Sequence, residues 1–164
     1  MVFKYIWAFL QGLIFLYLQI LLMPAFTIAG AIPNLLLPWM IYSIWAKPLN
    51  VAAVTGFLIA LMYDATLPAS FGMHAVIFLI LCVVVDLFRK PFEAESLVAK
   101  LLTLFTGNVV FSLINHLVFG LSYGFDGKLF NLILISFCYN LVVSFIVFWV
   151  MKFLSQLRLV IEHD

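Results

Sequence analysis

Apolar runs long enough to cross a lipid bilayer fill most of this 164-residue chain. Hydrophobic residues make up 67% of it and charged residues 9%, and the mean hydropathy is +1.26. A soluble domain of this size leaves much of its surface in water, so it could not hide that much apolar surface. The composition therefore excludes a soluble enzyme and a disordered chain, and it predicts a polytopic membrane protein.

Charged residues, Pro and Gly divide the chain into six apolar segments. A transmembrane helix needs about 20 apolar residues, whereas a strand of a membrane barrel shows about ten residues of alternating polarity. These runs are too long and too uniformly apolar for strands. We therefore expect an all-α membrane protein with six transmembrane helices in a single domain, residues 1–164. The expected segments are 5–23, 32–46, 49–65, 72–89, 97–122 and 129–155.

The second and third segments are short for a membrane crossing. Each has about 15 apolar residues, which corresponds to about 22 Å of helix. Lys47, Pro48 and their neighbours are all that separates them. They form either two short spans, which we favour, or one re-entrant hairpin that enters the membrane and returns.

Lysine and arginine gather in alternate loops. With six spans and a cytoplasmic N-terminus, seven of the eight Lys and Arg residues lie on the cytoplasmic side, and Lys128 is the exception. Because cytoplasmic loops carry these residues in excess, we expect both termini in the cytoplasm. The formal net charge of +1 offers no basic domain for binding nucleic acid.

Small residues line one face of the third segment. Every fourth position there is Ala52, Gly56, Ala60 and then Asp64. Residues at this spacing share a helix face, and small side chains on it let another helix approach closely. Asp64 is either the end of this packing seam, in reach of interfacial water, which we favour, or an ion or proton site.

Polar side chains recur on one face of each of the last two segments. Folding the chain at a turn near residues 122–128 brings each polar residue of one segment level with one of the other. We expect interhelical hydrogen bonds between these pairs, each worth about 0.6 kcal/mol; the alternative is the lining of a site for a small polar ligand. The pairs are Asn108 with Ser144, Ser112 with Asn140, and Asn115 with Ser136.

One loop, after the fourth segment, is dense in charge. It is a solvated turn with pairing at the helix end, or the place where a cytoplasmic partner makes contact. The motifs of catalytic, cofactor and metal sites are missing from the sequence, so we expect no enzyme, no cofactor and no metal. The charged residues are Asp86, Arg89, Lys90 and Glu93.

Residues 33–72 carry a pattern that resembles MreD, the family of bacterial rod-shape-determining membrane proteins. Pro33 has no backbone N–H and can therefore occupy the first position of a helix, where an N–H would have no partner within the helix. Gly72 permits a turn into the next segment. Ala60 departs from the pattern, because many members carry a second Gly there. The matching positions are Pro33, Asn34, Gly56, Asp64 and Gly72.

The resemblance implies a non-catalytic scaffold subunit of the cell-elongation machinery in the bacterial cytoplasmic (inner) membrane. Such a subunit binds MreC, which has one membrane span, and through it MreB and the synthases of the peptidoglycan wall. It can also form a homo-oligomer within that complex. The family is similar in fold to the S-components of energy-coupling-factor transporters. That similarity implies an alternative function, the substrate-binding subunit of a vitamin transporter.

Overall fold

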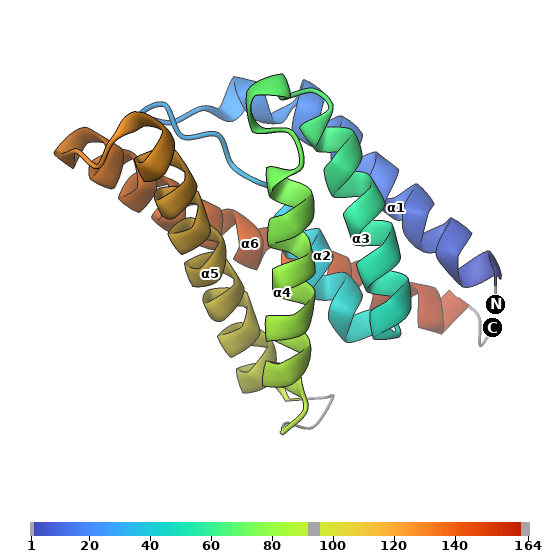
Figure 1. The fold of residues 1–164 in the computed structure, drawn as a ribbon. Helices are drawn as coiled ribbons and strands as arrows, with labels where there is room; N and C mark the ends of the chain where they lie inside the picture. The colour runs from blue at the N-terminus through green and yellow to red at the C-terminus, as the bar shows by residue number, and fades with distance from the viewer. Residues whose placement is uncertain (1, 92–95, 162–164) are drawn as a thin grey trace.

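A computed structural model describes residues 2–91 and 96–161 of the chain (Figure 1). Throughout these residues the regular structure is helical, which confirms the expected all-α class. Two short 3-10 helices, η1 (Met23–Phe26) and η2 (Pro68–Ser70), interrupt the connections. The six α-helices are α1 (Val2–Leu21), α2 (Leu36–Ala46), α3 (Leu49–Asp64), α4 (Met73–Arg89), α5 (Leu97–Tyr123) and α6 (Gly127–Ile161).

In the part of the chain that the structure describes, three of the six helices are long and apolar enough to cross a membrane. They are Val2–Leu21, Leu97–Tyr123 and, within α6, Gly127–Ser155. Many large apolar side chains of these helices lie on the surface of the molecule. Lipid tails solvate such a surface without cost, so the chain is an integral membrane protein.

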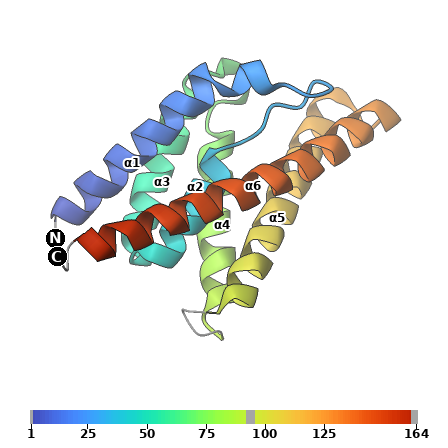
Figure 2. The ribbon, with the colours of Figure 1, turned by 180° about the vertical axis from the view of Figure 1, so that it is seen from behind.

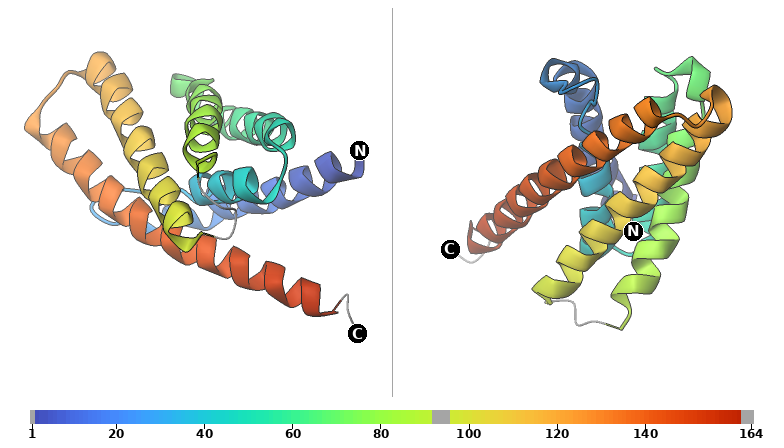
Figure 3. Two further views of the ribbon diagram at one scale, coloured as in Figure 1. Left: turned by 90° about the horizontal axis from the view of Figure 1, so that it is seen from below. Right: turned by 90° about the vertical axis from the view of Figure 1, so that its left-hand side faces the viewer.

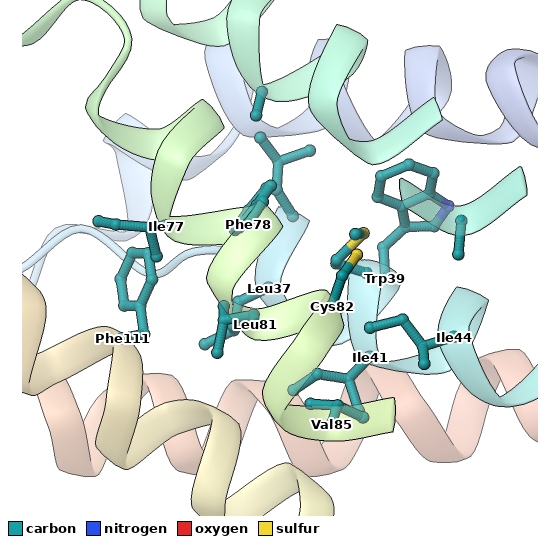
Figure 4. Close-up of a cluster of buried hydrophobic side chains, with 14 of the residues drawn as sticks. Leu37, Trp39, Ile41, Ile44, Ile77, Phe78, Leu81, Cys82, Val85 and Phe111 are labelled. Carbon is teal, nitrogen blue, oxygen red and sulfur yellow. The ribbon is translucent and has the colours of Figure 1, made fainter. Parts of the chain in front are cut away.

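The helix α2 occupies the centre of the molecule. Five other helices, α1, α3, α4, α5 and α6, pack against it. Its side chains and those of α4 belong to one apolar core, as Figure 4 shows for Trp39 of α2 and Cys82 of α4. With 11 residues, α2 is about 16 Å long, which is half of the hydrocarbon thickness of about 30 Å.

The helix in the expected segment 32–46 begins later than expected, at Leu36. Residues 27–35 are not helical, and they run from the end of α1 into the middle of the bundle, where α2 begins (Figure 1). Pro33 disfavours the helical conformation for the residue before it, which keeps this stretch extended. Irregular chain enters first, and a half-length helix follows. Whether the second and third segments form two short spans or one re-entrant hairpin stays a prediction.

The two last helices form an antiparallel hairpin beside the other four. In Figure 2, which shows the molecule from behind, α6 crosses in front of α2. Figure 3 shows its C-terminal part running beyond the other helices. In α6, therefore, one part packs on α2 and α5 while another part is left uncovered.

Candidate functional site

The segment around Pro33 and Asn34 is held by side chains from both ends of the sequence. Gln19 of α1, 3% exposed, donates from Nε2 to the Pro33 carbonyl at 3.1 Å and accepts at Oε1 from the Leu35 N–H at 2.7 Å. Asn140 of α6 accepts at Oδ1 from the Asn34 N–H at 2.7 Å. Irregular backbone at membrane depth is tolerated where protein groups satisfy it, and these bonds do so.

The buried helix α2 is capped at both ends. At its start, Asn34 Oδ1 accepts from the N–H groups of Leu36 (2.9 Å) and Leu37 (3.1 Å), which is the usual role of an Asn before a helix. At its end, Arg89 of α4 donates to the Ile44 carbonyl. A cation at this position also complements the negative end of the helix dipole. Pro33 thus precedes the cap and does not begin the helix.

The charged residues after the fourth segment are paired among themselves. Asp86 accepts from Arg89 Nε at 2.9 Å and lies 3.1 Å from Lys90 Nζ. Asp86 is buried and Arg89 reaches α2, so both stabilise the fold at this end. Lys90 remains 65% exposed. Glu93 lies outside the described residues.

Asp64 is buried and joins α3 to the beginning of α4. Its side chain is 0% exposed. It accepts from His74 Nδ1 at 2.6 Å, from the His74 N–H at 3.3 Å and from the Ala75 N–H at 3.0 Å. The carboxylate therefore caps a helix other than its own. The expectation of an Asp in reach of interfacial water is wrong, because the chain turns at Gly72 (φ +85°) and folds α4 over it.

The small residues of α3 lie in the interior. Ala52 and Ala60 are fully buried. A Cβ on Gly56 would meet the Sδ of Met40 in α2, so Gly56 admits the central helix. This close approach lets α3 pack against α2, and α3 also packs against α1 and α4.

The polar faces of α5 and α6 meet at one of the three expected pairs. Asn108 Nδ2 donates to Ser144 Oγ at 3.1 Å, and both side chains are buried. Among the described residues no hydrogen bond joins Asn140 to Ser112; the Asn140 carbonyl oxygen accepts from the Asn34 N–H instead. Ser112, Asn115 and Ser136 instead line a cavity, which corresponds to the alternative left open by the sequence.

That cavity, the polar cavity, has a volume of about 630 Å³. Helices α1, α3, α4, α5 and α6 and the segment before α2 contribute to its wall. Apolar side chains such as Phe111, Leu129 and Ile133 complete it. Its polar side chains are Gln19, Asn34, Tyr63, Ser70, His74, Ser112, Asn115, Tyr123, Ser136 and Asn140.

Sequence reasoning missed five of the polar residues of this site: Gln19, Tyr63, Ser70, His74 and Tyr123. Gln19 is one of two glutamines in the apolar run of α1, and it was a usable signal because an amide in lipid needs a partner. His74 stands ten positions after Asp64, and nothing in that spacing predicts contact. Among residues 2–91 and 96–161, no group of three His, Cys, Asp or Glu side chains could hold a metal ion.

Comparison with known sequences gives one match. The sequence model of the family described as rod shape-determining protein MreD matches residues 2–157, nearly the whole chain. No curated protein and no solved structure matches it. The expected similarity to S-components therefore has no support from these comparisons.

Proposed function

Because the chain belongs to the rod shape-determining protein MreD family, we propose that it is a non-catalytic membrane scaffold that holds the single span of an MreC-type partner. Through that partner it supports MreB and the peptidoglycan synthases during elongation. The family match over residues 2–157 carries this proposal. The distribution of Lys and Arg supports a multi-pass protein of the cytoplasmic membrane with both termini inside.

The uncovered part of α6 is the surface we propose for the partner's span. Ile146, Trp149, Val150 and Phe153 are exposed and recur at the spacing of one helix face. On the opposite side of the helix, Phe148 is buried and packs edge-to-face on Tyr42 of α2, with ring centroids 5.8 Å apart. This contact holds α6 against the core, so the apolar face is presented by a fixed helix.

Co-purification from mild detergent tests this surface. In the Trp149→Ala/Phe153→Ala variant we expect recovery of the co-expressed MreC-type partner to fall at least tenfold, because two large contact side chains are lost. The matched control is Leu117→Ala/Leu121→Ala, which removes two exposed side chains from α5 and should leave recovery unchanged. Equal recovery with both variants would refute the surface. Failure of the unaltered chain to retain the partner would refute the function.

The charged turn after α4 is a second proposed contact, on the cytoplasmic side. Lys90 is its most accessible described cation, whereas Asp86 and Arg89 hold the fold together. We expect Lys90→Gln, which places no second negative charge beside Asp86, to weaken association with a cytoplasmic component of the machinery while lowering thermal stability only slightly. An unchanged association in pull-down would remove Lys90 from the contact.

A further inference from the structure

The polar cavity is lined by neutral side chains. Its polar groups are amides, hydroxyls and one imidazole, and none of its described lining residues is Lys, Arg, Asp or Glu. A charged ligand group would lose its hydration there without gaining an ion pair, which is costly in a low-dielectric interior. The lining therefore favours an uncharged ligand group that forms hydrogen bonds.

Several polar groups of the wall are available to such a ligand. Ser112, Asn115 and Ser136 lie on facing helices, and none of the hydrogen bonds among the described residues engages them. His74 adds a further polar group: its Nδ1 is bonded to the Asp64 carboxylate at 2.6 Å, and none of the hydrogen bonds among the described residues engages its Nε2. Hydroxyl, amide and imidazole groups together suit a ligand with several hydroxyls.

A second hollow adjoins the polar cavity. It has a volume of about 650 Å³ and lies between the beginning of α4 and the end of α5, where Val76, Ile77 and Val118 line it. We call it the apolar hollow. Ser70, Met73, Phe119 and Tyr123 line both spaces, so one space continues into the other. Among the described side chains that line the apolar hollow alone, Ser122 is the one polar residue, and its hydroxyl already donates to the Val118 carbonyl at 2.9 Å. The side-chain groups open to a ligand therefore gather in the polar cavity. That arrangement fits a molecule with a polar end and an apolar end.

We propose that the two spaces together bind an uncharged lipid with a hydroxylated headgroup, such as a monoacylglycerol. The headgroup occupies the polar cavity, with its hydroxyls on Asn115, Ser136 and His74. The acyl chain lies in the apolar hollow between α4 and α5. A volume of about 630 Å³ is within the usual range of about 300–1,000 Å³ for small-molecule sites.

Photolabelling of the full chain in detergent tests this site. The probe is a monoacylglycerol with a diazirine in its acyl chain, and labelled peptides are mapped by mass spectrometry. We expect label on peptides of α4 and α5 that line the apolar hollow, displaced at least fivefold by excess unlabelled monoolein. The same acyl chain on a phosphate headgroup should label these peptides at least fivefold less.

A matched pair of variants tests the polar end. Asn115→Leu removes an amide from the cavity wall, whereas Asn131→Leu makes the same change at an exposed position of α6 outside it. We expect a fivefold or larger loss of displaceable label in the first and none in the second, with equal thermal stability. Equal labelling of the two variants, label that monoolein does not displace, or equal labelling by the phosphate probe would each overturn the proposal.

Discussion

The central helix α2 and the last helix α6 are both strongly apolar, yet they solve the problem of backbone polarity in different ways. The 35-residue α6 forms its own hydrogen-bond ladder over a length that exceeds the bilayer. The 11-residue α2 ends within the protein. Its ends are satisfied by Asn34 and Arg89, and the segment before it by Gln19 and Asn140.

The comparison teaches that apolar character alone does not identify a membrane span. A half-length helix is stable at membrane depth when other elements cover it on all sides and cap both ends. The region around α2 should therefore depend on individual side chains of its neighbours, while the α5–α6 hairpin should tolerate change. Matched substitutions in the two regions test this contrast.

The largest loss of stability is expected for substitution of Asp64, and the exposed capping residue Asp126 serves as its comparison. Asp64→Leu leaves the His74 ring and two buried N–H groups unpaired, which should cost about 3–6 kcal/mol. Asp126 caps α6 from an exposed position, with the Leu129 N–H 2.7 Å from Oδ1, and its change to Leu should cost about 1 kcal/mol. Unfolding by SDS in mixed micelles measures both values. Similar losses would show that Asp64 is no more than a surface cap.

Two isoleucines offer the next contrast. Ile41 of α2 is fully buried, whereas Ile146 of α6 is 59% exposed. Ile41→Ala should cost about 2–5 kcal/mol because it leaves a cavity in the core. Ile146→Ala should change stability by less than about 0.5 kcal/mol in the isolated chain. A small cost at Ile41 in the same unfolding experiment would contradict the central role of α2.

Replacing a tightly packed glycine by alanine should lower stability by a smaller amount. A Cβ on Gly12 of α1 would lie 2.6 Å from Ile59 Cγ1 and 2.8 Å from the Trp39 ring. Gly12→Ala should therefore destabilise by about 1–3 kcal/mol through overpacking. Gly127, at the start of α6, has open space at that position, so Gly127→Ala is the control. Equal melting temperatures for the two variants would mean that α1 can move away from α2.

The smallest effect concerns Lys47 at the end of α2. Burial lowers the pKa of Lys47 from 10.5 to about 8, while Nζ donates to Gln11 Oε1 at 2.6 Å. The unfolded chain holds this proton up to about pH 10.5. The burial therefore opposes folding below pH 8, and this penalty fades between pH 8 and 10.5.

Acylation by an amine-reactive reagent measures the titration of Lys47 directly. We expect half-maximal modification near pH 8, with the exposed Lys128 on the hairpin as the internal reference for reagent exposure. Gln11→Leu removes the acceptor without changing the size of the side chain much, and it should lower the midpoint further. A midpoint near pH 10 would contradict the burial of this amine.

Part of the site followed from spacing along the chain. The pairing of Asn108 with Ser144 follows from folding two helices at a short turn. Such a turn fixes which residues of the two antiparallel helices lie at the same depth in the membrane. The partner of Asn140 did not follow, since it lies 106 positions away in an irregular segment. Gln19 and His74 were missed for the same reason: their partners belong to elements whose packing no local pattern encodes.

Composition and the lengths of its apolar runs were enough to determine that this chain is a helical membrane protein, because lipid admits few ways to satisfy a backbone. Local pattern also placed the small face of α3 and the polar faces of α5 and α6. Tertiary structure decided that α2 is a buried half-helix, that Asp64 caps α4, and that three polar residues line a cavity. Those outcomes depend on contacts between segments that are distant in the sequence, and such contacts produce no periodic pattern of residues that could predict them.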